Sequence, residues 1–242
     1  MNVLRNYLIT GGTSGIGETV ARHLAGLGHA VWVTGTTADG VARAIHERFA
    51  TGGSVADVTL AEMVEFAFAE ARVGLGSLHG VFLNAGIDGE AKPAAELDAN
   101  NFARVLAVNT VGVLTSAQAA YRHLERPGQI VVNASVNALR PEALFADYNA
   151  SKAATLSIAK SLALEWSAEG LGVVAICPGY FDSRMTAPYL SDPAIAAELL
   201  QGIPAQRFGT PNDIGSLLEF LLGPNASYLT GSTISIDGGR SL

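Results

Sequence analysis

Several residue types are scarce in this 242-residue chain, and each scarcity narrows the class of protein. A single cysteine, Cys177, excludes an intrachain disulfide framework and is typical of a reducing compartment. The five His residues have no cysteine partners at zinc-site spacing, so we expect no metal. Lys and Arg number 15 against 22 Asp and Glu, and the net charge of −7 argues against a nucleic-acid partner.

Long apolar runs are also absent. No stretch approaches the ~18 consecutive apolar residues of a membrane span. The first ten residues lack the charged segment and the apolar stretch of a secretory leader. We therefore expect no membrane partner and a soluble, cytoplasmic protein.

Apolar residues and glycine, in contrast, are plentiful. Hydrophobic residues make up 49% of the chain and charged residues only 15%, a composition typical of a folded protein with a large core. The 27 glycines show no collagen-like period, so they are either linker residues or residues placed at turns. The length suits one α/β domain.

Short apolar runs alternate with longer segments in which apolar residues recur every three or four positions. The runs are rich in Val and Ile, as strands buried on both faces are. The alternation predicts an α/β fold: one doubly wound domain over residues 1–242, with a seven-stranded, mostly parallel sheet and helices on both faces. The irregular segment of about residues 180–203 is expected to form a flap over a site. The predicted strands are Val3–Ile9, Ala30–Val33, Ser54–Ala56, Gly80–Leu83, Gln129–Val132, Gly172–Ile176 and Thr233–Ile236, and the predicted helices include Ile16–Leu27, Leu60–Val73, Phe102–Leu124, Tyr148–Trp166 and Ile214–Leu222.

A glycine-rich segment, Thr10–Gly17, follows the first predicted strand and has the pattern T-G-x-x-x-G-x-G. Gly11 permits a tight turn, Gly15 lets a pyrophosphate approach the backbone, and Gly17 lets helix and strand pack closely. The helix that follows would present free N–H groups and a partial positive charge to phosphates. The alternative is a tight turn with a purely structural role.

Tyr148 and Lys152 are four residues apart, which places a phenol and an ammonium on one face of a helix. The ordinary pKa of Tyr is near ~10, and a nearby ammonium favours the phenolate. We therefore expect Lys152 to lower the pKa of Tyr148 and to make it a usable proton donor near neutral pH. The alternative is a pair exposed on the helix surface.

Together, the two motifs resemble the short-chain dehydrogenase/reductase family, and the resemblance covers essentially the whole chain. One departure is Leu83, which stands where the family usually has the first Asn of N-N-A-G. The other matching positions are Asp57-Val58, Asn84-Ala85-Gly86, Asn109, Ser135 thirteen residues before Tyr148, Pro178-Gly179, Arg207–Pro211, Thr230-Gly231 and Asp237–Gly239.

The resemblance implies a Rossmann fold and hydride transfer between a nicotinamide and a carbonyl or alcohol carbon. By this resemblance Tyr148 is the general acid/base and Ser135 hydrogen-bonds the substrate oxygen. Lys152 holds the nicotinamide ribose, and Asn109 holds a water that links Lys152 to solvent. The implied catalytic set is therefore Asn109, Ser135, Tyr148 and Lys152.

The implied cofactor site extends from the glycine turn to the end of the sixth strand. Gly35 stands at the position of the acidic residue that selects NAD, and Ser14 and Thr36 stand where NADP enzymes often carry basic residues. Hydroxyl groups at Ser14 and Thr36 favour NADP(H), while NAD(H), with Asp39 reaching the ribose, remains the alternative. The implied cofactor residues are Gly11, Thr13, Ser14, Gly15, Ile16, Gly17, Thr36, Asp57, Val58, Asn84, Ala85, Gly86, Tyr148, Lys152, Pro178, Gly179, Phe181 and Ser183.

The expected substrate is a small or medium carbonyl compound, and two arginines suggest that it bears an acidic group. The expected substrate residues are Asn137, Arg140, Phe145 and Arg184. A second reading is a 3-oxoacyl-acyl-carrier-protein reductase, with Arg122 and Arg126 as a basic docking patch. A reading of another class is a nucleotide-binding sensor or scaffold without turnover. The family resemblance also implies a homotetramer or homodimer.

Overall fold

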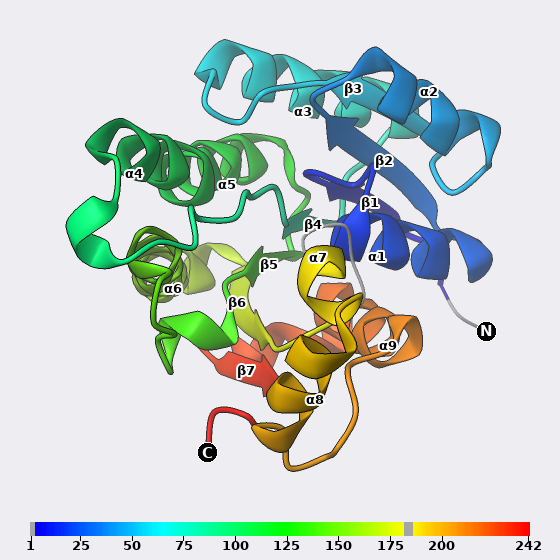
Figure 1. Ribbon diagram of the computed structural model, residues 1–242. Coiled ribbons are helices and arrows are strands. Elements are labelled where there is room, and N and C mark those ends of the chain that lie inside the picture. The colour runs from blue at the N-terminus through cyan, green and yellow to red at the C-terminus, as the bar shows by residue number, and fades with distance from the viewer. Residues whose placement is uncertain (1–2, 182–185) are drawn as a thin grey trace.

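The computed structural model describes residues 3–181 and 186–242, and its centre is a seven-stranded sheet (Figure 1). The strands lie in the order β3-β2-β1-β4-β5-β6-β7, and each pairing between neighbours is parallel, so the predicted mostly parallel sheet is entirely parallel over the described residues. The chain moves outward from β1 to β3 and then returns to pair β4 with β1. This reversal makes the carboxyl ends of β1 and β4 a topological switch point, where ligands of such sheets bind. The strands are β1 (Asn6–Ile9), β2 (Ala30–Gly35), β3 (Gly52–Val55), β4 (Gly80–Leu83), β5 (Gly128–Asn133), β6 (Leu171–Pro178) and β7 (Thr233–Ile236).

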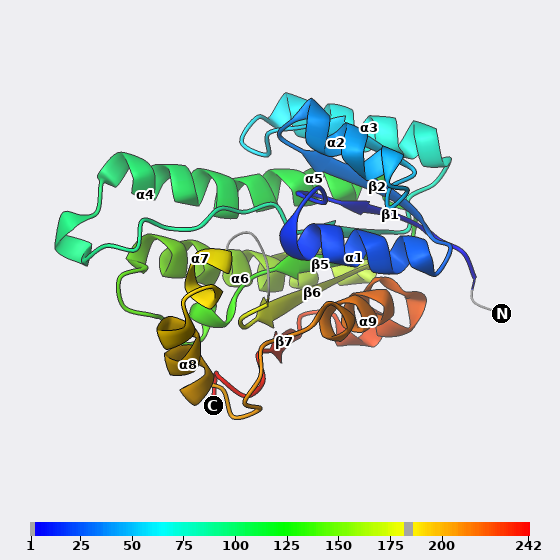
Figure 2. The same cartoon turned by 45° about the vertical axis from the view of Figure 1, so that its right-hand side comes forward.

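Helices cover both faces of the sheet, as predicted (Figure 2). On one face α1 (Gly15–Gly26), α2 (Ala38–His46) and α9 (Pro211–Leu222) enclose a buried cluster that includes Ile9 and Val33. On the other face α3 (Ala61–Leu75), α5 (Gly112–His123) and α6 (Ala146–Trp166) enclose a second cluster that includes Phe68, and α4 (Ala99–Leu106) packs against α6. Two cores of this kind explain why β4, β5 and β6 are buried along their whole length.

The segment predicted as one helix, Phe102–Leu124, contains an interruption. A single π-helical turn, Ala107–Val111, separates α4 from α5, and it carries Asn109. Such turns bulge the backbone out of α-helical register and are frequent at functional sites. Short 3₁₀ turns occupy Ala94–Glu96, Val136–Ala138, Ser167–Glu169 and Pro224–Leu229.

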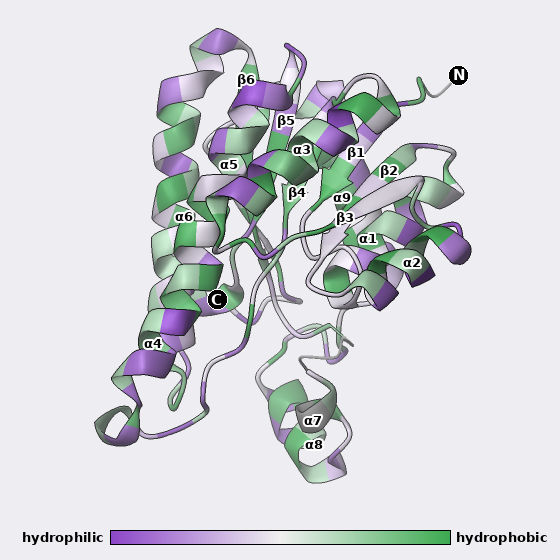
Figure 3. Ribbon diagram, turned by 90° about the horizontal axis from the view of Figure 1, so that it is seen from above, coloured by the Kyte–Doolittle hydropathy of each residue, from purple (hydrophilic) through white to green (hydrophobic). Residues whose placement is uncertain are grey.

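Two short helices, α7 (Ala187–Leu190) and α8 (Pro193–Gln201), lie within the segment predicted as a flap. They stand apart from the two helical layers in Figure 3. The Asp192 side chain caps α8 by accepting the backbone N–H groups of Ala194 and Ile195. Our list of helices omitted α2 and α8, in which few side chains are buried. No helix in the described part of the chain is long and apolar enough to cross a membrane.

Candidate active site

A cavity of about 1230 Å³ opens along the carboxyl edge of the sheet, at the switch point between β1 and β4. Most of the residues that the sequence singled out line it. Gly17, Asn109 and Arg140 do not belong to the described lining, and Ser183 and Arg184 lie outside the described residues. The predicted residues that do line it are Gly11, Thr13, Ser14, Gly15, Ile16, Thr36, Asp57, Val58, Asn84, Ala85, Gly86, Ser135, Asn137, Phe145, Tyr148, Lys152, Pro178, Gly179 and Phe181.

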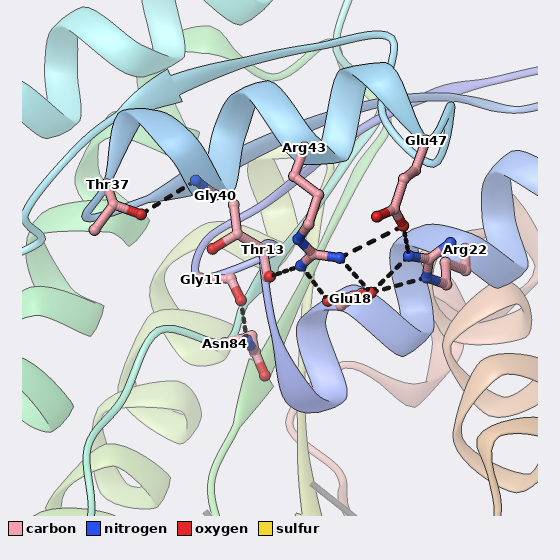
Figure 4. Close-up of polar contacts among 9 residues, drawn as sticks. All are labelled: Gly11, Thr13, Glu18, Arg22, Thr37, Gly40, Arg43, Glu47 and Asn84. Carbon is pink, nitrogen blue, oxygen red and sulfur yellow. Dashed lines mark hydrogen bonds and ion pairs between the residues drawn. The ribbon is translucent and has the colours of Figure 1, made fainter. Parts of the chain in front are cut away.

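The glycine turn, Thr10–Gly17, packs directly against the loop that follows β4. Gly11 has a φ of +62°, a conformation that glycine adopts without strain. A Cβ atom on Gly17 would overlap the Gly11 carbonyl oxygen and lie 2.5 Å from Asn84 Nδ2. Asn84 Nδ2 donates to the carbonyl oxygen of Gly11 at 3.1 Å (Figure 4) and to that of Thr10 at the same distance. Gly17 therefore acts beneath the cavity floor, where it permits this close packing.

Thr10 was not predicted as a site residue, although it joins the two strands at the switch point. Its Oγ1 accepts the backbone N–H groups of Asn84 at 2.9 Å and Ala85 at 3.1 Å. Thr10 is only 3% exposed, so these bonds are shielded from water. In the sequence, the feature that could have indicated this role is that Thr10 directly precedes Gly11 in the glycine-rich segment.

The start of α1 fits a pyrophosphate. Ser14 precedes the helix in an extended conformation, and its side chain makes no capping hydrogen bond. The first backbone N–H groups of the helix therefore have no side-chain acceptor from this residue, and an anionic ligand can accept them. Ser14, Gly15 and Ile16 line the cavity at this point.

The end of β2 leaves no room for an acidic side chain. A Cβ atom on Gly35 would lie 2.6 Å from Thr13 Oγ1, because the Thr13 side chain occupies that space. Arg43 on α2 holds the turn in place: its Nη2 donates to the Thr13 carbonyl oxygen at 2.7 Å and to Glu18 at 2.7 Å (Figure 4). Arg43 was not among the predicted site residues, and its long side chain reaches the glycine turn from the second turn of α2.

Tyr148 lies in the first turn of α6, half-buried, with Ser135 as its neighbour. Burial raises the pKa of Tyr148 to about 12, a side-chain hydrogen bond from Ser135 opposes this, and the charges of Asp88 and Glu142 raise it further. Ser135 Oγ accepts the backbone N–H of Asn137 at 3.1 Å, which leaves its O–H to donate. Both side chains line the cavity.

Lys152 is 4% exposed, and its Nζ donates to the Asn133 carbonyl oxygen at 2.8 Å. Nζ lies 5.7 Å from the centroid of the Tyr148 ring. Burial lowers the pKa of Lys152 to about 8. The expected lowering of the Tyr148 pKa by Lys152 is absent, because burial disfavours the charged form of both groups and dominates both shifts.

Asn109 is fully buried behind the cavity wall, where it holds the loop after β4. Its Nδ2 donates to the Ile87 carbonyl oxygen at 2.9 Å, and its Oδ1 accepts the Ile87 N–H at 2.8 Å. Its own carbonyl oxygen accepts the Thr155 hydroxyl at 2.6 Å. The π turn thus places Asn109 between this loop and α6, behind Lys152.

The substrate end of the cavity differs from the predicted one. Asn137 and Phe145 line it, as predicted. Arg140 is exposed and its Nη1 donates to the backbone oxygen of Arg240 at 2.6 Å, so its side chain serves the C-terminal segment. The arginines in the described lining are Arg104 and Arg240, and carboxylates line the same end at Asp88, Glu142 and Glu198. Sequence spacing gave no signal for Arg104, Glu142, Glu198 and Arg240, because they come from separate segments, whereas Asp88 follows closely after the Asn84-Ala85-Gly86 turn.

The geometry is that of a nucleotide-dependent oxidoreductase with a Rossmann-type sheet, and comparisons with known proteins agree. A family model described as enoyl-(acyl carrier protein) reductase matches residues 11–241. 4-Formylbenzenesulfonate dehydrogenase TsaC1/TsaC2 of Comamonas testosteroni is 36% identical over 97% of each chain. The 3-oxoacyl-[acyl-carrier-protein] reductase MabA of Mycobacterium tuberculosis is 33% identical over 99% of this chain and 94% of its own.

Among solved structures, 3-ketoacyl-(acyl-carrier-protein) reductase from Brucella melitensis, complexed with NADH, superposes with a TM-score of 0.91 at 29% identity over 98% of each chain. The chain belongs to the short-chain dehydrogenase/reductase family. It is an NAD(P)-dependent oxidoreductase that acts on alcohol or carbonyl groups.

Proposed function

We propose that the chain reduces a carbonyl, or oxidises the corresponding secondary alcohol, of a small or medium substrate, with Tyr148 as the general acid/base. The observation that carries this proposal is the placement of Ser135, Tyr148 and Lys152 together in the wall of one cavity that also contains the glycine turn. The nicotinamide supplies or accepts the hydride.

In the reductive direction, the Tyr148 phenol donates a proton to the substrate oxygen. A pKa of about 12 keeps this phenol in its protonated, donor form at neutral pH, whereas oxidation of an alcohol needs the phenolate and therefore a lower pKa. The Ser135 O–H donates to the same oxygen, where negative charge develops. Lys152 Nζ donates to the Asn133 carbonyl and would hold the nicotinamide ribose, and Asn109 fixes the loop after β4.

For the cofactor, NADP(H) is favoured over NAD(H). A carboxylate at the end of β2 would repel a 2′-phosphate, and Thr13 fills the space that such a residue would need. Ser14 and Thr36 offer hydroxyl groups in the lining. The catalytic efficiencies with NADPH and NADH test this choice, and a strong preference for NADH would refute it.

For the substrate, the structure weakens the argument for an acidic group. Arg140 serves the C-terminal segment, and the carboxylates at the substrate end offset Arg104 and Arg240. The name of the relative from Comamonas testosteroni, a sulfonate dehydrogenase, keeps an anionic substrate as a candidate. We favour an uncharged carbonyl compound.

A carrier-linked substrate ranks second, supported by the description of the family model and by the relative from Mycobacterium tuberculosis. The expected docking arginines argue against it. Arg122 pairs with Glu65 at 2.7 Å near the end of α5, and Arg126 follows in the connection to β5. That connection lies at the amino edge of the sheet, whereas Tyr148 lines the cavity at the carboxyl edge.

The proposed assembly is a homotetramer or homodimer in the cytoplasm. A surface hollow between α5 and α6 is lined by Leu114, Ile158 and Trp166, and Leu164 on α6 is 86% exposed. Apolar groups in such number on neighbouring helices favour contact with a second copy. The single cysteine suits a reducing compartment. Sedimentation of the purified protein tests the assembly.

The test of the proposed reaction is a panel of aldehydes, ketones and secondary alcohols, assayed with both nicotinamides by absorbance at the reduced-cofactor band. We expect turnover with at least one uncharged carbonyl compound. Cofactor binding without turnover on the whole panel would favour the sensor or scaffold reading instead.

A further inference from the structure

One ion pair in the cavity wall joins parts of the chain that are far apart in sequence. Arg240, two residues before the last residue of the chain, donates through Nη2 to Glu142 Oε1, which precedes α6. The two side chains are 14% and 22% exposed, and both line the cavity. Other described ion pairs between side chains of Arg and carboxylates are more exposed on at least one partner, such as Arg207–Asp213 at 57% and 30%.

The C-terminal segment is shaped to present Arg240. The Asp237 carboxylate accepts the backbone N–H of Gly239 at 3.0 Å and of Ser241 at 2.8 Å, one on each side of Arg240. Gly238 and Gly239 have φ values of +64° and +90°, which let the chain turn. Arg140 then holds the Arg240 carbonyl oxygen.

The Glu142 carboxylate also accepts hydrogen bonds from two further residues at the substrate end. Its Oε1 also accepts the Tyr180 hydroxyl at 2.8 Å, and its Oε2 accepts Asn137 Nδ2 at 3.3 Å. The Arg240 guanidinium lies 5.0 Å from the centroid of the Tyr180 ring. We call Asn137, Glu142, Tyr180 and Arg240 the substrate wall.

The charges of the pair act on the reaction centre. Glu142 is among the groups whose charge raises the pKa of Tyr148, so its field reaches the phenol. Arg240 balances that charge at hydrogen-bond distance. In a partly buried wall an unpaired charge destabilises the fold, because its desolvation is not compensated. Such a charge also strongly affects the binding of a charged ligand.

We propose that Glu142 and Arg240 form a specificity-determining pair that keeps the substrate wall electrically balanced and so selects uncharged substrate groups. This inference rests on the proposed reaction only where its test measures turnover. Removing Glu142 leaves a cation in the wall and shifts preference toward anionic substrates. Removing Arg240 leaves a carboxylate and shifts preference away from them.

The experiment compares Glu142→Gln, Arg240→Gln and the double variant with the wild type. The substrate pair is an uncharged carbonyl compound from the panel and its carboxylate-bearing analogue, for example methyl 4-formylbenzoate and 4-formylbenzoate. The readout is the ratio of kcat/KM for the anionic compound to that for the uncharged one. We expect the ratio to rise at least tenfold in Glu142→Gln, to fall at least tenfold in Arg240→Gln, and to return within about threefold of wild type in the double variant.

Two further variants separate charge from general structure. Arg240→Lys keeps the cation and should keep the ratio near wild type. Arg207→Gln breaks the exposed Arg207–Asp213 pair outside the cavity lining and should leave the ratio unchanged. If both single variants lower the two efficiencies by the same factor, the pair is merely structural and the proposal is wrong.

A binding arm is independent of turnover. Dissociation constants of benzoate and benzamide for the enzyme–cofactor complex, measured by calorimetry, should show the same opposite shifts in the two single variants. If nothing on the panel is reduced but these shifts occur, the proposed reaction fails and the pair's role stands. Equal effects on benzoate and benzamide would overturn the pair's role.

Discussion

The cofactor end and the substrate end of the cavity are held together by different kinds of contact. At the cofactor end, Gly17 lies against the backbone of Gly11, and Asn84 donates to backbone carbonyls of the same turn. At the substrate end, Glu142 contacts Tyr180 and Arg240 through side chains alone, across 38 and 98 residues of sequence.

This difference matches the tasks of the two ends. Backbone contacts depend on glycine and on the path of the chain, so the cofactor end tolerates little change and suits a ligand that many enzymes share. Side-chain contacts can be exchanged without moving the backbone, so the substrate wall can change its specificity while the fold persists. Lys152 and Tyr148 lie where the two ends meet.

The largest effect should come from adding one methyl group at the cofactor end. Gly17→Ala places a Cβ atom against Gly11 and Asn84, and we expect it to lower the free energy of unfolding by about 3 kcal/mol and to weaken cofactor binding at least tenfold. The control is Gly26→Ala in the same helix, where a Cβ atom meets nothing within 4 Å. Denaturant unfolding measures the stability of each variant, and cofactor titration measures its cofactor affinity. If the two variants had the same stability and the same cofactor affinity, close packing of Gly17 against the backbone would not be what holds the cofactor end together.

The next largest effect should be the change of stability with pH that Lys152 causes, at the junction of the cofactor end and the substrate end. Its pKa is lowered from 10.5 to about 8 in the folded protein, so between these pH values the unfolded chain holds a proton that the folded chain has released. Stability therefore rises with pH across this window, by about 3 kcal/mol relative to Lys152→Met. Denaturant unfolding of both proteins at pH 7.5, 9.0 and 10.5 measures the difference. A constant difference would show that Lys152 keeps an ordinary pKa.

The smallest effect should come from Thr10, whose hydroxyl accepts two backbone N–H groups across the switch point. Thr10→Val keeps the shape and leaves the two buried donors unpaired, which should cost about 1–3 kcal/mol, with the lower half of that range expected where the loop can adjust. Thr115→Val, at a half-buried position of α5 where the hydroxyl only donates to the Val111 carbonyl, is the matched control and should be near neutral. The free energies of unfolding of both variants, measured in urea, test this prediction. A neutral Thr10→Val would show that this contact does not hold the two strands together.

The fold was predictable because its signals are local. The seven apolar runs overlap β1 to β7 with bounds that differ by up to three residues, and the periodic segments likewise overlap α1, α3, α6 and α9. The helix α2 escaped because it buries only Val41 and Ala44, so its apolar stripe is too short to stand out. The π turn at Asn109 could not be anticipated, because it depends on the fit of this helix to the loop after β4 and to α6.

The site divides in the same way. The glycine turn follows a contiguous motif and could be located from residue spacing, whereas the other residues expected at the cofactor end came from the family resemblance, and neither signal pointed to Thr10 or Arg43 as site residues. The substrate wall arises where Glu142, Tyr180 and Arg240 meet in space, and no spacing in the sequence encodes that meeting. Arg140 was assigned to the substrate for its charge, yet its charge serves the backbone of Arg240.

The central claim, that Tyr148 supplies the proton at the junction of the two ends, is tested most directly by Tyr148→Phe. Tyr121→Phe is the matched control, since the Tyr121 hydroxyl donates to Glu169 outside the cavity lining. Turnover and the cofactor dissociation constant are measured for each protein on the best panel substrate. We expect Tyr148→Phe to lower kcat at least a hundredfold with cofactor affinity within about threefold of wild type, and Tyr121→Phe to change neither. Wild-type turnover in Tyr148→Phe would contradict it.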